Sequence, residues 1–397
     1  MDALVIGGGV AGPATAMALR KAGLDVRVLE AFDRPADDAG SFLTVAPNGL
    51  HALEVLGVDH GDLGGFDTPT MQMRNETGRL VATVPQSAPG GGLRSQTVRR
   101  ADLYAALRDA AARRGIAVEH GKRLVDAEVG PDGRVTATFA DGTTATADLL
   151  VGADGLRSRT RRLLDPDAPR PRWTGLLNSG GYARGVDVPG NDGVFTMVFG
   201  GRAFFAYVRR GPGDVWWFAN VPQHAEPSDA DLAAWTPDAW RAQLRRLVAD
   251  DDSPALALID ATPTIDGPWS TRDLPRVPVW HRGPIGLVGD AAHAISPTSG
   301  QGASLAVEDG LVLARCLRDL GDPAAAFAAF DGLRRHRVER LVAQAKRTSN
   351  LKIPGVVTRT LRDRVILPLV GRAAARRTHD WVADYRVDWD EPVSAPR

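Results

Sequence analysis

The chain is poor in cysteine and lysine. Cys316 is the single cysteine among 397 residues, which excludes an internal disulfide or a cysteine metal cluster. It lies in the apolar stripe of a predicted helix, where we expect a buried small side chain. Lysine occurs only at positions 21, 122, 346 and 352, so most of the 48 basic residues are arginine, a bias that we attribute to genomic base composition.

Net charge and long apolar runs are also missing. The 48 basic residues balance 48 acidic ones, so no overall field favours nucleic acid or an anionic membrane. No window approaches the length of a membrane helix, and no basic segment of a secretory signal opens the chain. We therefore expect a cytoplasmic protein without a nucleic-acid partner or stable membrane insertion. Its length favours two structural units over one.

The opening stretch, from Asp2 to Glu30, has the pattern of a dinucleotide site. Residues 4–6 form a short apolar strand, glycines follow in G-x-G-x-x-G spacing, and residues 14–22 are typical of a helix. Glycines there permit a tight turn, approach to a pyrophosphate and close helix packing. A second strand ends at Glu30, where a carboxylate can bind ribose hydroxyls. This pattern fits FAD and NAD equally.

Two later segments also place an aspartate beyond the end of a predicted strand. Residues 149–151 precede Asp154, and residues 285–288 precede Asp290. Ligands of open α/β sheets bind at such strand ends. His293, a few residues farther on, is expected to be packed and hydrogen-bonded, and we assign it no catalytic role.

Together, the three segments carry a family resemblance. In this order and separation they resemble the FAD-dependent aromatic hydroxylases, the class A flavoprotein monooxygenases with the p-hydroxybenzoate hydroxylase fold. The resemblance extends from about residue 3 to 389 and includes RRADLYAAL, PRVPVWHRGPIGLVGDAAH and WVADYRVDW. The subgroup that it most resembles includes urate and salicylate hydroxylases.

The resemblance implies an α/β fold in two interleaved parts. An FAD-binding Rossmann-like domain of the glutathione reductase type would comprise residues 1–70, 98–171 and 272–350. A substrate domain built on a mixed β-sheet would comprise residues 71–97 and 172–271. Residues 351–397 are predicted to be helical, packed across the FAD domain or in a dimer contact; the protein would be a monomer or homodimer.

The resemblance also implies cofactor-binding positions. Glu30 and the first glycines would hold the adenosine half, Arg100 the phosphates or ribityl chain, and Asp290 a ribityl hydroxyl. Asp154 and Arg157 would belong to a segment associated with both FAD and the nicotinamide. The full set is Gly7, Gly9, Val10, Ala11, Gly12, Glu30, Arg100, Asp154, Arg157, Gly289, Asp290, Pro297, Gly300, Gln301, Gly302 and Ala303.

Elementary electrostatics supports the last part of this set. A reduced flavin becomes anionic near N1 and the C2 carbonyl, and a helix that starts near Gly302 would direct its positive end there. Glycines at 300 and 302 would admit a close backbone approach. For Asp290 a helix cap, and for Arg157 a solvated surface cation, are the alternatives.

The implied activity is that of a single-component FAD-dependent monooxygenase. A C4a-hydroperoxyflavin would deliver one oxygen atom to an electron-rich aromatic or polycyclic molecule, by hydroxylation or epoxidation. The protein would supply orientation and exclusion of water. No second glycine fingerprint follows a strand, so NADPH or NADH would dock transiently as co-substrate. The residues suggest no metal site and no nucleophilic triad.

The substrate domain is rich in aromatic residues. A sheet above the flavin would direct alternate side chains toward a pocket. Arg202 is close to a position that some urate-type relatives use to anchor substrate, although an exposed turn arginine is the alternative. Pocket candidates are Arg202, Phe204, Tyr207, Trp217 and Thr298, with Met71, Met73 and Phe195 as weaker ones.

One departure from the family pattern affects the substrate. Urate-type relatives carry an acid directly after the loop proline, whereas Thr298 follows Pro297 here. Urate hydroxylation assisted by that acid is therefore in doubt, and an aromatic, indole-like, polyketide or terpenoid substrate fits better. A flavin-dependent halogenase, a flavin-dependent reductase of a prenyl-type substrate and a non-catalytic FAD/ligand-binding flavoprotein are the alternatives. The halogenase is disfavoured because no lysine lies between Lys21 and Lys122.

Overall fold

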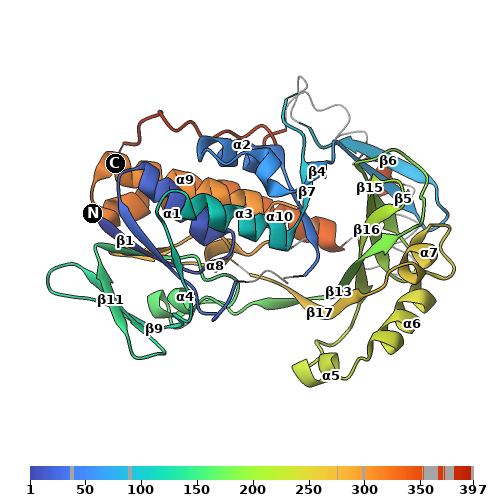
Figure 1. Cartoon of the computed structure of the whole chain (residues 1–397), viewed down its shortest axis with the longest axis horizontal. Coiled ribbons are helices and arrows are strands. Elements are labelled where there is room, and N and C mark those ends of the chain that lie inside the picture. The colour runs from blue at the N-terminus through green and yellow to red at the C-terminus, as the bar shows by residue number, and fades with distance from the viewer. Residues whose placement is uncertain are drawn as a thin grey trace.

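The computed structural model describes most of the chain. It covers residues 1–35, 40–87, 92–274, 276–296, 300–350, 352, 365–369, 371 and 380–394, with the side chains of 347–350 left out. Within these ranges the fold is α/β and has two lobes (Figure 1). No helix of the described part is long and apolar enough to span a membrane.

The first lobe is built on a six-stranded, largely parallel sheet. Its strand order is β18 (His281–Arg282), β19 (Ile285–Leu287), β12 (Leu149–Gly152), β1 (Asp2–Ile6), β2 (Asp25–Leu29) and β8 (Val118–Glu119). Only the β18–β19 pair is antiparallel. The central strands β1 and β12 are almost entirely buried, which explains their continuous apolar sequences.

Helices and two small sheets complete this lobe. The helices are α1 (Ala11–Lys21), α2 (Pro47–Val55), η1 (His60–Leu63), α3 (Arg100–Ala112), α4 (Arg159–Leu164), α8 (Asp290–His293), α9 (Gly302–Leu320) and α10 (Pro323–Asn350). The small sheets are β9 (Leu124–Val129) with β10 (Val135–Phe139) and β11 (Thr144–Ala147), and β3 (Phe42–Val45) with β7 (Gln96–Arg99) and β4 (Phe66–Asp67).

The second lobe is a seven-stranded mixed sheet with helices on one face. Its order is β17 (Ile265–Asp273), β13 (Arg172–Arg184), β16 (Asp214–Pro222), β15 (Phe204–Gly211), β14 (Val194–Phe199), β5 (Thr70–Asn75) and β6 (Leu80–Pro85). The helices are α5 (Asp229–Ala233), α6 (Pro237–Val248) and α7 (Ala255–Asp260). The long strands β13 and β17 extend from the first lobe into the second (Figure 1).

Side chains point alternately to the two sides of each strand, so the sheet has two faces, and both are apolar. Phe205 and Tyr207 of β15 face the core under α6 and α7. Phe204 and Val208 face the other way, toward β3 and β4 of the first lobe. Phe42 of β3 lies 5.6 Å from the ring of Trp216, so aromatic packing joins the two lobes.

The chain beyond α10 is only partly described. Residues 365–369 have helical backbone, whereas 380–394 form turns and irregular chain. The rest of the predicted C-terminal helical segment, apart from 352 and 371, lies outside the described residues.

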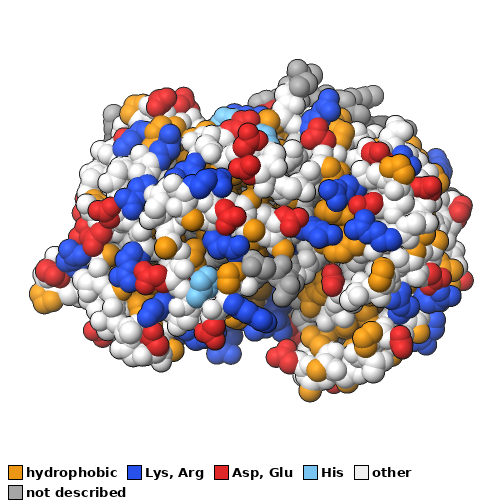
Figure 2. Space-filling view, in the orientation of Figure 1, with side chains coloured by type: hydrophobic (Ala, Val, Ile, Leu, Met, Phe, Trp, Pro, Cys, Tyr) orange, Lys and Arg blue, Asp and Glu red, His pale blue; other side chains and the backbone are white. Residues whose placement is uncertain are grey.

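Charges are distributed evenly over the surface in view. Figure 2 shows basic and acidic side chains interspersed across both lobes, without a broad region of one sign on that face. This agrees with the balanced composition.

Helix α9 is held in place by a close crossing with α1. A Cβ added at Gly310 of α9 would stand 2.8 Å from the Cα and 3.0 Å from the backbone nitrogen of Thr15 in α1. Thr15 and Gly310 are both buried. Only glycine allows this distance between the two helices, which sets the direction of α9.

We predict that Gly310→Ala destabilises the protein despite the better helix propensity of alanine. The forced separation of the helices should cost about 1–3 kcal/mol, as in other overpacked cores. Gly332→Ala in α10 is the matched control, because a Cβ there meets no atom within 4 Å. The control should gain up to about 1 kcal/mol. Urea unfolding of both variants measures this, and equal stability would contradict the steric argument.

Candidate functional site

The three sequence motifs converge at the carboxyl edge of the parallel sheet. Ile6 of β1 is paired with Gly152 of β12, and Gly152 is paired in turn with Leu287 of β19. On the other side, Ile6 is paired with Leu29 of β2, next to Glu30. Motifs almost 300 residues apart in the sequence therefore end side by side, at the edge where α/β proteins bind ligands.

The glycine turn between β1 and α1 has the close contacts that its spacing predicts. Gly7 has φ +116°, and a Cβ there would stand 2.4 Å from the carbonyl oxygen of Ala153. A Cβ at Gly12 would stand 1.8 Å from the carbonyl oxygen of Gly7. A Cβ at Gly9, by contrast, would meet no atom within 4 Å. The turn is therefore packed against the protein at two glycines and open at the middle one.

Helix α1 begins directly after this turn. Val10 is its N-cap and Ala11 its first residue, and no side chain caps the helix or places an acid in its first turn. The positive end of the helix dipole is thus not neutralised by a side chain of the helix, which suits a phosphate ligand.

Glu30 closes the other side of the turn. Its Oε2 accepts a hydrogen bond from the backbone nitrogen of Gly8 at 2.5 Å, and its Oε1 accepts one from Phe32 at 2.9 Å. The carboxylate is therefore held over the glycine turn and remains partly exposed. The ribose-binding role expected of Glu30 stays a prediction.

Asp290 and Arg100 come together next to the start of α9. Asp290 Oδ1 lies 4.0 Å from the position of a Cβ on Gly302. Both charged side chains remain accessible, yet burial is the largest influence on the pKa of each. Burial raises the pKa of Asp290, against the effects of His293 and Arg100. Both groups are therefore accessible to a ligand, although neighbouring parts of the chain displace some of their hydration.

The start of α9 is lined by backbone. Gly300 has φ +62°, and a Cβ there would lie 3.8 Å from the carbonyl oxygen of Thr44 in β3. Gln301 is the N-cap residue and its Oε1 accepts a hydrogen bond from Asn48 of α2 at 3.0 Å. Ala303 follows in the first turn. Two other predicted positions, Pro297 and Thr298, lie outside the described residues.

Asp154 and Arg157 have different surroundings. Asp154 Oδ2 accepts hydrogen bonds from the backbone nitrogens of Arg159 and Thr160, at 2.8 and 2.9 Å, so its carboxylate organises the start of α4. Arg157 is exposed, and within the described residues its guanidinium forms no hydrogen bond, ion pair or ring contact. Arg157 could therefore bind a phosphate of the nicotinamide cofactor or be a solvated surface cation, and both interpretations remain.

Sequence reasoning missed Arg161, which connects two of the motifs. It is 2% exposed, and it donates to the carbonyl of Leu156 at 2.7 Å and to that of Ala291 at 2.9 Å. The turns after β12 and β19 are thereby tied together. Only an arginine with a spread of donors can bridge two carbonyls in this way. Its position in a basic stretch gave no signal, because neighbouring arginines are exposed.

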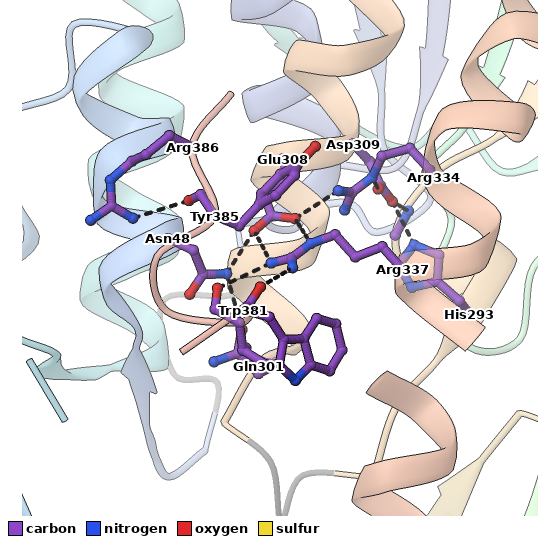
Figure 3. A network of polar contacts seen from close by, with 12 residues as sticks. Asn48, His293, Gln301, Glu308, Asp309, Arg334, Arg337, Trp381, Tyr385 and Arg386 are labelled. Carbon is purple, nitrogen blue, oxygen red and sulfur yellow. Dashed lines mark hydrogen bonds and ion pairs between the residues drawn. The ribbon is translucent and has the colours of Figure 1, made fainter. Parts of the chain in front are cut away.

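A buried ion network behind the site was also missed (Figure 3). Glu308 and Asp309 of α9 face Arg334 and Arg337 of α10, and three of these four side chains have no exposed area. Arg334 Nε donates to Asp309 at 2.8 Å and its Nη1 lies 2.7 Å from Glu308. Arg337 Nε donates to Glu308 at 3.1 Å. Two carboxylates thus balance two guanidinium groups within the core.

This network holds the elements that form the site. Asp309 Oδ2 accepts a hydrogen bond from the backbone nitrogen of Gly289 at 2.9 Å and lies 2.5 Å from His293 Nε2. Glu308 Oε1 accepts one from Asn48 of α2 at 2.7 Å. His293 is therefore buried and paired, as expected. The turn that carries Asp290 is fixed to the same helix whose first residues lie beside it.

The C-terminal segment is attached to the network as well. Arg337 donates to the carbonyls of Trp381 and Val382 at 2.8 and 3.2 Å, and its guanidinium lies 3.8 Å from the centre of the Tyr385 ring. The WVADYRVDW stretch of the sequence therefore packs against α10 through backbone acceptors and an aromatic face.

The pocket candidates of the seven-stranded sheet do not share one face. Phe204 is on the face toward β3, together with Trp216 and Phe218. Tyr207 and Trp217 were predicted to line the same pocket, but they pack under α6 and α7, where Trp217 Nε1 donates to Thr262 at 2.8 Å. Their sequence neighbours lie on the face toward β3 instead, because the side chains of a strand alternate and the sequence alone does not give the register.

Other substrate-site candidates are placed as follows. Met71, Met73 and Phe195 lie on the face toward β3 with Phe204. Arg202 lies in the β14–β15 turn, is half exposed and pairs with the exposed Asp250. This surface ion pair matches the alternative interpretation of Arg202 as a turn arginine.

The site fits FAD on the evidence of its own geometry. The glycine turn is open at Gly9, the uncapped start of α1 faces it, and Glu30 lies beside it. At the other end, Asp290 lies beside the glycine-lined start of α9. A ligand that reaches both places must be long, and a phosphate part would suit the start of α1, as in FAD.

Comparisons with known proteins identify the family. A model of the family described as "FAD binding domain" matches residues 1–345, and the chain belongs to this family. It is 31% identical to the FAD-dependent urate hydroxylase of Klebsiella pneumoniae, over 88% of this chain and 90% of that protein. It is 30% identical to the 6-hydroxynicotinate 3-monooxygenase of Pseudomonas fluorescens, over 85% and 88%.

Solved structures agree with the fold. The crystal structure of Klebsiella pneumoniae HpxO complexed with FAD and uric acid superimposes with a TM-score of 0.81 at 29% identity, covering 94% of this chain and 95% of that one. The predicted family, the interleaved α/β fold and FAD as cofactor are thereby confirmed, as is the enzyme class, an FAD-dependent monooxygenase.

We predict that Asp309→Asn loosens both the core and the site. Removing one member of a buried ion network should cost about 3–5 kcal/mol. Burial alone would raise the pKa of Asp309, but His293 and Arg334 lower it to about 2. Its contribution to stability is therefore present at neutral pH and is lost as the pH falls from about 4 toward 2.

Urea unfolding from pH 7 down to 3 measures this effect, together with the FAD affinity of each variant. Asp319→Asn is the control, because Asp319 is on the same helix in a surface pair with Arg318 and should cost less than about 1 kcal/mol. If the difference in unfolding free energy between wild type and Asp309→Asn stayed constant over this pH range, the ionic role assigned to Asp309 would be refuted.

Proposed function

We propose that the protein is a single-component FAD-dependent monooxygenase that uses NADPH or NADH and O2. It would insert one oxygen atom into an electron-rich aromatic or polycyclic small molecule, by hydroxylation or epoxidation. The observation that carries the proposal is the position of the start of α9. It lies beside Asp290 and, through β3, next to the aromatic face of the seven-stranded sheet.

The chain's own residues would act in two places. Glu30 and the first glycines would hold the adenosine half, while the positive end of α9 would stabilise negative charge on the ring system. When bound, FAD supplies the reductive activation of O2. The protein contributes binding, orientation and exclusion of water.

The aromatic face is suited to a flat substrate. Phe42 of β3 lies 6.0 Å from Phe218 of β16, and Phe195 and Phe204 lie 6.2 and 5.8 Å from the same ring. Planar molecules pack well against such tilted rings, and the site would exclude water once filled. This face supports an aromatic substrate without selecting a particular one.

The proposal keeps the predicted division of the chain. The six-stranded sheet draws its strands from residues 1–70, 98–171 and 272–350, which would bind FAD. The seven-stranded sheet, with a strand that begins at residue 70, would bind substrate. A cytoplasmic location and a monomeric or homodimeric state are further parts of the proposal.

The deciding experiment measures oxygen transfer. The purified holoenzyme is screened with urate, 6-hydroxynicotinate, salicylate and polycyclic phenols for faster NADPH or NADH oxidation. Each active compound is then incubated under ¹⁸O2 and its product analysed by mass spectrometry. We expect one ¹⁸O atom per product molecule. A reductase of a prenyl-type substrate would give a reduced product without ¹⁸O, and a binding protein would give no product.

We predict separate effects for two charged residues of the site. Asp290→Ala should weaken FAD binding, because one charge-assisted hydrogen bond is worth about 1.5–3 kcal/mol. Arg157→Ala should slow reduction by the nicotinamide more than it changes FAD content. Equilibrium dialysis and anaerobic stopped-flow reduction measure the two properties. Unchanged FAD retention in the first variant, or unchanged reduction in the second, would refute the corresponding role.

A further inference from the structure

Lys352 occupies an unusual place on the aromatic face of the seven-stranded sheet. It is 2% exposed. Its Nζ donates a hydrogen bond to Asn220 Oδ1 of β16 at 2.6 Å, and it lies 3.7 Å from the ring centre of Phe204 and 5.3 Å from that of Phe218. It is one of only four lysines in the chain.

The surroundings do not satisfy a charged ammonium group. Such a group has three donors, and among the described residues only Asn220 accepts one of them. The strands around Lys352 present Phe204 from β15, and Phe218 and Asn220 from β16. Among the described residues, Lys352 forms no ion pair, and burial is the one cause of its pKa shift. Other ionisable groups lie farther along this part of the sheet. Arg99 lies over the rings of Tyr182 and Trp216, and Arg210 over that of Trp216. Asp266 of β17 is paired with Gly180 of β13. Burial lowers the pKa of Lys352 to about 7.

Asn220 is itself fixed in place. It is paired with Asn178 across the β13–β16 ladder and donates to the Oδ1 atom of that residue. Its own oxygen is therefore directed at Lys352. An amine held by an oriented amide, rather than by a carboxylate, keeps its basicity available for another partner.

Lys352 faces the proposed substrate region. Phe218 lies 6.0 Å from Phe42 at the start of β3, and the carbonyl of Thr44 in the same strand lies beside Gly300. Opposite Phe218, β13 has Gly180, whose missing side chain leaves the backbone next to Ser41. The amine, the aromatic rings and the start of α9 therefore adjoin one another through β3.

We propose that Lys352 binds the acidic ring hydroxyl of the substrate and accepts its proton. This inference rests on the proposed monooxygenase function and specifies the substrate class: an aromatic or heteroaromatic compound with an ionisable hydroxyl group. A benzene ring without such a group would be a poor substrate.

The proton transfer is balanced within the pair. The substrate O–H bond breaks and an N–H bond forms on Nζ, so a neutral amine and a neutral hydroxyl become an ammonium ion and an oxyanion. The oxyanion supplies the acceptor that the buried ammonium lacks, and the aromatic rings lie against the cation. The negative charge of the oxyanion raises the electron density of the ring carbons that receive an electrophilic oxygen.

The test compares matched ligand pairs on the holoenzyme. Binding of salicylate and benzoate, and of 6-hydroxynicotinate and nicotinate, is measured from the change in flavin absorbance. Wild type should prefer the hydroxyl-bearing member by about tenfold or more, the worth of one charge-assisted hydrogen bond. Lys352→Met should abolish that preference while leaving the other member's affinity unchanged. Lys122→Met is the control, because Lys122 pairs with Asp141 on the remote β9–β11 part.

A second measurement observes the amine itself. Selective ¹⁵N-lysine labelling gives four Nζ resonances, and Lys352→Met assigns the relevant one. At pH 8 the hydroxyl-bearing ligand should shift this resonance from neutral amine to ammonium, whereas its counterpart should not. Lys352→Arg adds a kinetic test, since arginine stays protonated. It should retain ligand binding and lose turnover, most strongly at pH values where the free hydroxyl is not ionised.

The outcomes separate the two proposals. If wild type oxidises none of the ring compounds with ¹⁸O incorporation, the monooxygenase proposal fails. If wild type does so, but the ligand preference survives in Lys352→Met, only the role of Lys352 is refuted. If neither ligand shifts the Nζ resonance of Lys352, the role of Lys352 is refuted as well. Circular dichroism and FAD content confirm that each variant is folded.

Discussion

The attachment of Asp309 to Gly289 is the interaction on which the rest of the site depends. It joins the turn after β19 to α9, whose first residues lie beside Asp290. Arg334 neutralises the carboxylate from the other side. A buried charge is tolerated only with such partners, so the helix, the turn and α10 can hardly move separately. The turn that carries Asp290 and the start of α9 are therefore held in a fixed relative position.

The two lobes divide the tasks of an oxygenase between them. The parallel sheet gathers the strand ends that would bind a long cofactor, and the mixed sheet presents an aromatic face toward β3. Phe42 connects them through its contact with Trp216. Because α6 and α7 cover the opposite face, only one side of the mixed sheet is available to a substrate.

The cofactor half of the site was predictable because its residues are local signals. Gly7 and Gly12 of the first turn each allow a close backbone approach, and Glu30 and Asp290 follow apolar strands within a few residues. The partners that hold these residues were not predictable. Arg161, Asp309 and Arg337 act across intervals in the chain that no periodicity encodes, and similar arginines elsewhere are merely exposed.

The sequence by itself determined the α/β class, the family and the three motifs that meet at the sheet edge, since these depend on backbone geometry and short spacing. Tertiary structure alone decided which aromatic side chains of the mixed sheet face β3. A shift of one residue reverses the faces of a strand, and this is why Trp216, not Trp217, lies toward β3. It also decided that Lys352 is buried against Asn220, because that contact arises only when the chain after α10 packs on a distant strand.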